Sequence, residues 1–76
     1  MDRKNYIGQR IRKARKEAKP QITQVELIAR LEILGVFMNQ ASLSKVENGN
    51  RPVSDIEVKA FAEALKVPVS WLFEKS

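Results

Sequence analysis

Hydrophobic residues recur along the chain at intervals of three and four positions, and this spacing predicts helices. The first stripe comprises Ile7, Ile11, Ala14 and Ala18. It predicts a helix from residue 5 or 6 to about residue 19, because Pro20 pushes the residue before it out of the helical region. No segment shows the sustained alternation of apolar and polar residues that a strand needs.

A second helix is expected after a short linker at Gln21 and Ile22. Thr23 is a candidate N-cap, and Glu26 stands three residues later, which is the spacing of a capping box. The apolar positions that follow are Leu27, Ile28, Leu31 and Leu34. They predict a helix that runs to about residue 34, with Gly35 as the residue that ends it.

The segment from residue 35 to residue 52 predicts a third, short helix. Asn39 is its candidate N-cap and Gly49 its expected left-handed end. Leu43 and Val46 share one face of this helix. The opposite face carries Gln40, Ala41, Ser44 and Lys45. These side chains are small or able to form hydrogen bonds, and none is a carboxylate, so the face suits the floor of a DNA major groove.

Two further helices complete the chain. Ser54 and Glu57 repeat the capping-box spacing. The stripe that follows comprises Val58, Phe61, Ala62 and Leu65. It predicts a helix from residue 55 to about residue 66. Ser70 is a candidate cap for a last short helix that contains Trp71, Leu72 and Phe73.

Five helices with short connections predict a compact all-α fold. Seventy-six residues are enough for a single domain with one small core, so we expect one domain over residues 1–76 with its core at about 7–73. The second and third helices would form a helix-turn-helix if they pack near perpendicular. Spacing alone fits an ordinary helical hairpin equally well.

Composition excludes several kinds of site. The chain contains no histidine and no cysteine, which removes disulfide bonds, the usual zinc sites, and thiol or imidazole catalysis. It also has no glycine-rich phosphate loop and no obvious pair of catalytic carboxylates. We therefore expect no enzyme, no metal ion and no cofactor. There is no apolar run long enough to cross a bilayer and no apolar signal segment, so we expect a cytoplasmic protein without a membrane partner.

The net charge of +5 and the pI of about 9.9 point first to nucleic acid, and second to an anionic membrane or an acidic protein. Much of this charge lies in the first 19 residues. We interpret that stretch mainly as a solvated face, with Arg3, Lys4 and Arg10 as candidate phosphate contacts. A membrane-surface role is disfavoured because the apolar stripe of the first helix is small and is needed for the core.

Four segments of the chain, in order, resemble the phage Cro and repressor-type helix-turn-helix domains, the xenobiotic-response-element class of bacterial regulators. The segments are IGQRIRKARKEA, TQVELIARL, SLSKVENGNRPVS and AFAEALKVPVSWLF. The resemblance covers about residues 7–73 and implies a lambda-repressor-like domain that binds double-stranded DNA. The chain departs from the common pattern by an insertion at Pro20 and Gln21, by a longer second helix, and by Ile28 at a position that is often alanine.

The resemblance also implies roles for individual residues. The third helix, at about residues 40–48, would enter the major groove. Candidate base contacts are Asn39, Gln40, Ala41, Ser44 and Lys45. Candidate phosphate contacts are Gln24, Ser42, Asn48, Asn50 and Arg51. Arg15 and Glu47 match a pair that, in relatives, forms a partly buried ion pair between the first helix and the end of the third.

The aromatic C-terminal cluster has two interpretations. Trp71, Leu72 and Phe73 can belong to the core, or part of the cluster can form a dimer seam, and we expect a mixture. The function expected is that of a sequence-specific transcriptional regulator, more consistent with a repressor, bound as a homodimer to an inverted repeat. Such a protein would be nucleoid-associated and encoded by a bacterium or phage. The alternative is an antitoxin or other protein-interaction module of the same fold, with a protein partner.

Overall fold

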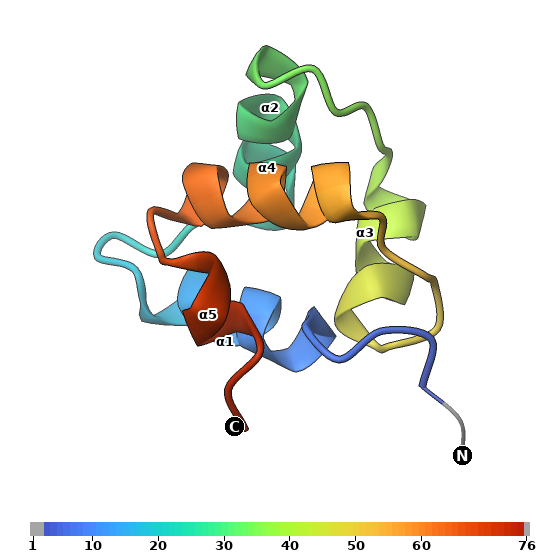
Figure 1. Cartoon of the computed structure of the whole chain (residues 1–76). Coiled ribbons are helices and arrows are strands. Elements are labelled where there is room, and N and C mark those ends of the chain that lie inside the picture. The colour runs from blue at the N-terminus through green and yellow to red at the C-terminus, as the bar shows by residue number, and fades with distance from the viewer. Residues whose placement is uncertain (1–2, 76) are drawn as a thin grey trace.

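The computed structural model describes residues 3–75 of the chain (Figure 1). Within these residues it contains five α-helices joined by loops, and no strand. The helices are α1 Gly8–Glu17, α2 Gln24–Ile33, α3 Gln40–Glu47, α4 Asp55–Leu65 and α5 Val69–Leu72. The predicted all-α fold with five helices is therefore confirmed. None of these helices is long and apolar enough to cross a bilayer.

Both predicted capping boxes are present. At the start of α2, the backbone N–H of Glu26 donates to the hydroxyl of Thr23, and the N–H of Thr23 donates to the carboxylate of Glu26, each at 3.1 Å. Ser54 and Glu57 form the same reciprocal pair at the start of α4, at 3.2 and 3.0 Å. These bonds satisfy N–H groups that have no partner within the helix, so the start of each helix is defined by local sequence.

The predicted glycine ends of α2 and α3 are also confirmed. Gly35 and Gly49 have φ values of 87° and 78°, in the left-handed region that favours glycine. After α3, the N–H of Asn50 donates to the carbonyl of Lys45 at 2.8 Å, and that of Gly49 donates to the carbonyl of Val46 at 3.0 Å. This arrangement satisfies the last carbonyls of the helix and turns the chain sharply away from it.

Two predicted boundaries were wrong. Helix α1 begins at Gly8 rather than at residue 5 or 6, because the side chain of Asn5 accepts hydrogen bonds from the N–H groups of Ile7 and Gly8 and holds Asn5 outside the helix. Helix α5 begins at Val69 with Pro68 in the N-cap position. Ser70 therefore lies inside the helix and does not cap it.

One core joins all five helices. Each helix contributes at least one side chain with no exposed surface: Ile11, Leu27, Leu43, Phe61 and Leu72. Helix α4 lies across α2 and also packs against α1 and α5, while α3 packs against α1 and α2 at the side of the molecule (Figure 1). Ile22 is buried as well, although its segment was predicted only as a linker. Its burial fixes the path of the chain from α1 to α2.

Candidate nucleic-acid interface

Helix α3 presents a polar face to solvent. Leu43 and Val46 are fully buried against the core, whereas Gln40, Ala41 and Lys45 are exposed on the outer side. The start of the helix is fixed by its predicted cap, in which the side-chain oxygen of Asn39 accepts a hydrogen bond from the N–H of Ser42 at 2.8 Å. The outer face of α3 has the donors, acceptors and methyl group that base edges require, and no carboxylate.

The first residue of α3 is held by the first residue of α2. The amide nitrogen of Gln40 donates to the amide oxygen of Gln24 at 3.1 Å. The amide nitrogen of Gln24 in turn donates to the carboxylate of Glu47 at 3.2 Å and to the hydroxyl of Ser44 at 3.3 Å. Gln24 thus links the start of α2 to both ends of α3, and its own orientation is fixed by these partners.

Ser44 differs from the expectation of an outward-pointing side chain. It is half-buried, and its hydroxyl lies between α3 and α2, at 3.3 and 3.4 Å from the two polar atoms of the Gln24 amide. Of the four residues predicted for the outer face, Gln40, Ala41 and Lys45 are exposed.

The network continues into the interior through Arg15 and Glu47. The guanidinium of Arg15 donates to both carboxylate oxygens of Glu47, at 2.8 and 2.9 Å, and to the carbonyl of Ile22 at 3.2 Å. Both side chains of the ion pair are largely buried. The pair joins α1 to the C-terminal end of α3, so the orientation of α3 depends on contacts with α1 as well as with α2.

The loop after α3 carries the remaining predicted phosphate contacts. Asn48 and Asn50 are exposed. Arg51 is half-buried and forms a two-pronged ion pair with Glu57, with both distances 3.2 Å, and it also donates to the carbonyl of Pro52. Burial acts to raise the pKa of Glu57, but hydrogen bonds from Arg51 and from the N–H of Ser54 outweigh it and lower the pKa below its ordinary value. The charge of Arg51 is therefore largely balanced within the fold.

The expectation that Arg10 contacts phosphate was wrong. Arg10 is buried against α5, where its Nε donates to the carbonyl of Trp71 at 2.9 Å. Its guanidinium carbon lies 3.6 Å from the centre of the Trp71 ring, and its terminal nitrogen lies 3.6 Å from the carboxylate of Glu74. This arginine attaches the C-terminal helix to α1 and is not available to DNA.

The C-terminal aromatic cluster divides between core and surface. Leu72 has no exposed surface and belongs to the core. Trp71 is half-buried beneath Arg10. Phe73 is 55% exposed, and it alone of the three presents a large apolar surface to solvent.

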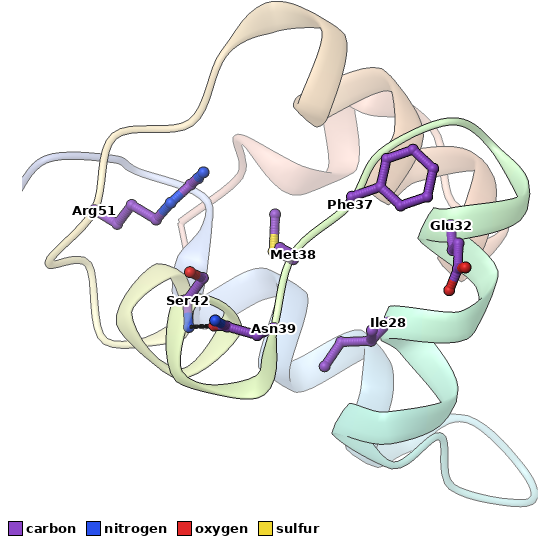
Figure 2. Close-up of a pocket in the computed structure, with 7 residues that line it drawn as sticks. All are labelled: Ile28, Glu32, Phe37, Met38, Asn39, Ser42 and Arg51. Carbon is purple, nitrogen blue, oxygen red and sulfur yellow. Dashed lines mark hydrogen bonds between the residues drawn. The ribbon is translucent and has the colours of Figure 1, made fainter.

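The connection between α2 and α3 forms one side of an open groove of about 390 Å³. Figure 2 shows that the groove is lined by Ile28 and Glu32 from α2, by Phe37, Met38 and the N-cap Asn39 from the connection, and by Ser42 from α3, with Arg51 at the far side. Within residues 3–75, every buried side-chain nitrogen or oxygen has a hydrogen-bond partner, and no cluster of acidic residues could hold a metal ion. The groove therefore contains no unpartnered buried group that would indicate a ligand.

Asn5 is a structural residue that sequence reasoning missed. It is buried at the junction of α1, α3 and the loop after α3, and its amide donates to the carbonyls of Val46 and Arg51. In the sequence it resembled an ordinary first-turn residue. The available signal was an asparagine two to three residues before an apolar helical stripe, a position that favours side-chain capping of the backbone.

The family model described as Helix-turn-helix matches residues 11–72 of the chain. The match spans all of α2, α3, α4 and α5 and most of α1. No curated protein and no solved structure matches the chain.

Proposed function

The chain belongs to the helix-turn-helix family of DNA-binding regulators of the Cro/C1 type, and we propose that it is a sequence-specific repressor. In this proposal α3 enters the major groove, and occupancy of the operator blocks access to a promoter. Two copies related by a two-fold axis bind an inverted repeat, with half-sites one helical turn, about 34 Å, apart. The protein acts in the cytoplasm, on the nucleoid.

The observation that carries the proposal is the exposed outer face of α3. Gln40 has the amide that reads adenine, Ala41 offers a methyl group to thymine, and Lys45 can reach guanine or a phosphate. Gln40 is already oriented by its hydrogen bond to Gln24. A side chain held before binding loses less conformational entropy on contact with a base, which favours a specific complex.

Phosphate contacts flank α3 on both sides in this proposal. Gln24 lies in the first turn of α2, where free backbone N–H groups attract an anion. The phosphates of the opposite DNA strand are contacted by Ser42, Asn48, Asn50 and Arg51. Arg51 shares its guanidinium between the carboxylate of Glu57 and the DNA backbone. Several such contacts imply that affinity falls steeply as salt rises.

The dimer seam is proposed to include Phe73. This side chain is 55% exposed beside Tyr6, which is 80% exposed, and the two line a common surface groove. Neighbouring aromatic side chains of this size favour burial against a second copy. Association off DNA is expected to be weak.

Selection of binding sites from a pool of random duplex DNA tests the proposal. The expected result is an enriched inverted repeat whose affinity exceeds that for unselected DNA by a large factor. Equal affinity for selected and unselected duplexes would contradict a sequence-specific regulator.

A second candidate is an antitoxin-like module of the same fold. It is favoured by exposed apolar side chains at the end of α2, in the connection and on α4: Ile33 at 85%, Phe37 at 75% and Ile56 at 72%. Large exposed apolar side chains on a small protein favour a protein partner. Co-purification with the product of an adjacent small reading frame distinguishes this candidate from a free-standing repressor.

A further inference from the structure

The N-terminal segment, residues 3–5, lies against the loop between α3 and α4 and outside the residues that the family model matches. The N–H of Lys4 donates to the carbonyl of Gly49 at 2.8 Å. A Cβ atom at Gly49 would lie 3.6–3.8 Å from the side-chain carbons of Arg3. The aliphatic part of Arg3 therefore passes over the glycine.

Asn5 fixes the position of this segment. Its amide nitrogen donates to the carbonyl of Val46 at 3.1 Å and to that of Arg51 at 2.8 Å. Its amide oxygen accepts from the N–H groups of Ile7 at 3.1 Å and Gly8 at 2.8 Å. One buried side chain thus joins the start of α1, the end of α3 and the loop after α3.

The positively charged side chains around this loop differ in whether a carboxylate of the protein pairs with them. Arg51 is paired with Glu57, whereas the exposed side chains of Arg3 and Lys4 are in no ion pair within residues 3–75. There is no acidic residue among residues 48–54. The accessible positive charge on this side of α3 therefore comes from the N-terminal segment more than from the loop itself.

We propose that residues 3–5 form a further phosphate-binding element of the DNA interface. Arg3 and Lys4 contact the backbone strand that runs along Asn48 and Asn50, and Asn5 is the positioning residue that holds them there. This inference rests on the proposed function. Phosphate contacts carry no sequence information, so the element adds affinity on all duplexes alike.

The test measures binding to random-sequence duplex DNA as a function of salt, with Arg3→Gln and Lys4→Gln combined. The control combines Lys59→Gln and Lys66→Gln, which remove the same charge from α4 and the residue after it. Each lost phosphate contact should reduce the slope of log affinity against log salt by about 0.9, so the first variant should lose about 1.8. At about 0.1 M salt its affinity should fall roughly tenfold or more. Equal slopes in the two variants would overturn the proposal.

Asn5→Ala tests the positioning role with both cations in place. It should reduce the slope of log affinity against log salt, measured at a temperature where circular dichroism shows the protein folded. Adding the Arg3 and Lys4 substitutions should reduce this slope little further. A purely structural role would lower the melting temperature and leave the slope of the folded protein unchanged, and this result would remove Asn5 from the proposal.

The outcomes also separate the inference from the function on which it rests. A wild-type protein that binds neither random-sequence nor selected duplexes contradicts the proposed function itself. A wild-type protein that binds with a steep salt dependence, retained when Arg3 and Lys4 are replaced, contradicts only the N-terminal phosphate element.

Discussion

The guanidinium of Arg15 holds both carboxylate oxygens of Glu47, at 2.8 and 2.9 Å, in the interior between α1 and the end of α3. A buried ion pair of this kind adds little net stability, but removing one partner leaves the other charge buried and unpaired. Because Gln24 also donates to Glu47, the same pair supports the side chain that orients Gln40. Core packing and the candidate recognition surface are therefore linked through one carboxylate.

Glu47→Ala is expected to lower the free energy of unfolding by about 3 kcal/mol or more, because Arg15 would remain buried without its partner. Thermal or urea unfolding measures the effect. Glu63→Ala, an exposed glutamate on α4, is the matched control and should change stability by no more than about 0.5 kcal/mol. Similar melting temperatures for the two variants would show that the ion pair is not structurally important.

Gln40→Ala is expected to cost about 1–3 kcal/mol on a selected operator and little on random DNA, since a base contact matters only where the right base is present. Fluorescence anisotropy with both duplexes measures the difference. Ser70→Ala, on α5 and away from α3, should leave both affinities unchanged. A loss of equal size on both duplexes would identify Gln40 as a phosphate contact instead.

Phe73→Ser is expected to weaken binding to a full inverted repeat by roughly tenfold while leaving binding to a single half-site unchanged, since an aromatic anchor at an interface is worth more than about 1 kcal/mol. Ile33→Ser removes an apolar side chain elsewhere that is more exposed than Phe73 and serves as the control. Equal effects of the two substitutions, or none from Phe73→Ser, would place the dimer seam on another surface.

Gly8→Ala is expected to destabilise the fold by about 1–3 kcal/mol, although alanine is the better helix former. A Cβ atom at this position would overlap the carbonyl oxygen of Val46 and lie 3.0 Å from that of Glu47. Chemical unfolding measures the loss, and Lys13→Ala on the exposed side of α1 should be nearly neutral. Stabilisation by Gly8→Ala would mean that α1 and α3 can separate without cost.

Glu57 is expected to make part of the stability depend on pH. Its pKa is lowered in the fold, so its contribution is present above its ordinary value of 4.5 and is lost as the pH falls through the lowered value. Glu57→Gln should therefore destabilise the protein more near pH 7 than near pH 3, as measured by unfolding at both pH values. An equal effect at both would show that the Arg51 and Ser54 contacts do not favour the charged form.

The helices themselves were largely predictable because their signals are local. Capping boxes at Thr23 and Ser54, glycine ends at Gly35 and Gly49, and apolar residues at intervals of three and four act within a few residues of each other. The same reasoning placed Gln40, Ala41 and Lys45 on the exposed face of α3, because Leu43 and Val46 define the opposite face. Their contacts with DNA remain predictions.

The partners of the polar side chains were decided only by the tertiary structure. Arg10 looked like a solvated cation but is fixed by Trp71, 61 residues away, and Ser44 turns toward Gln24 on another helix. Asn5 and Arg51 are likewise joined across 46 residues. By itself the sequence determined that five helices form, where the apolar faces of α1 to α4 lie, and where α2, α3 and α4 begin, since those depend on neighbouring residues. The packing of the helices decides which charged side chains are paired within the protein and which remain exposed to a partner. No local sequence pattern encodes this packing.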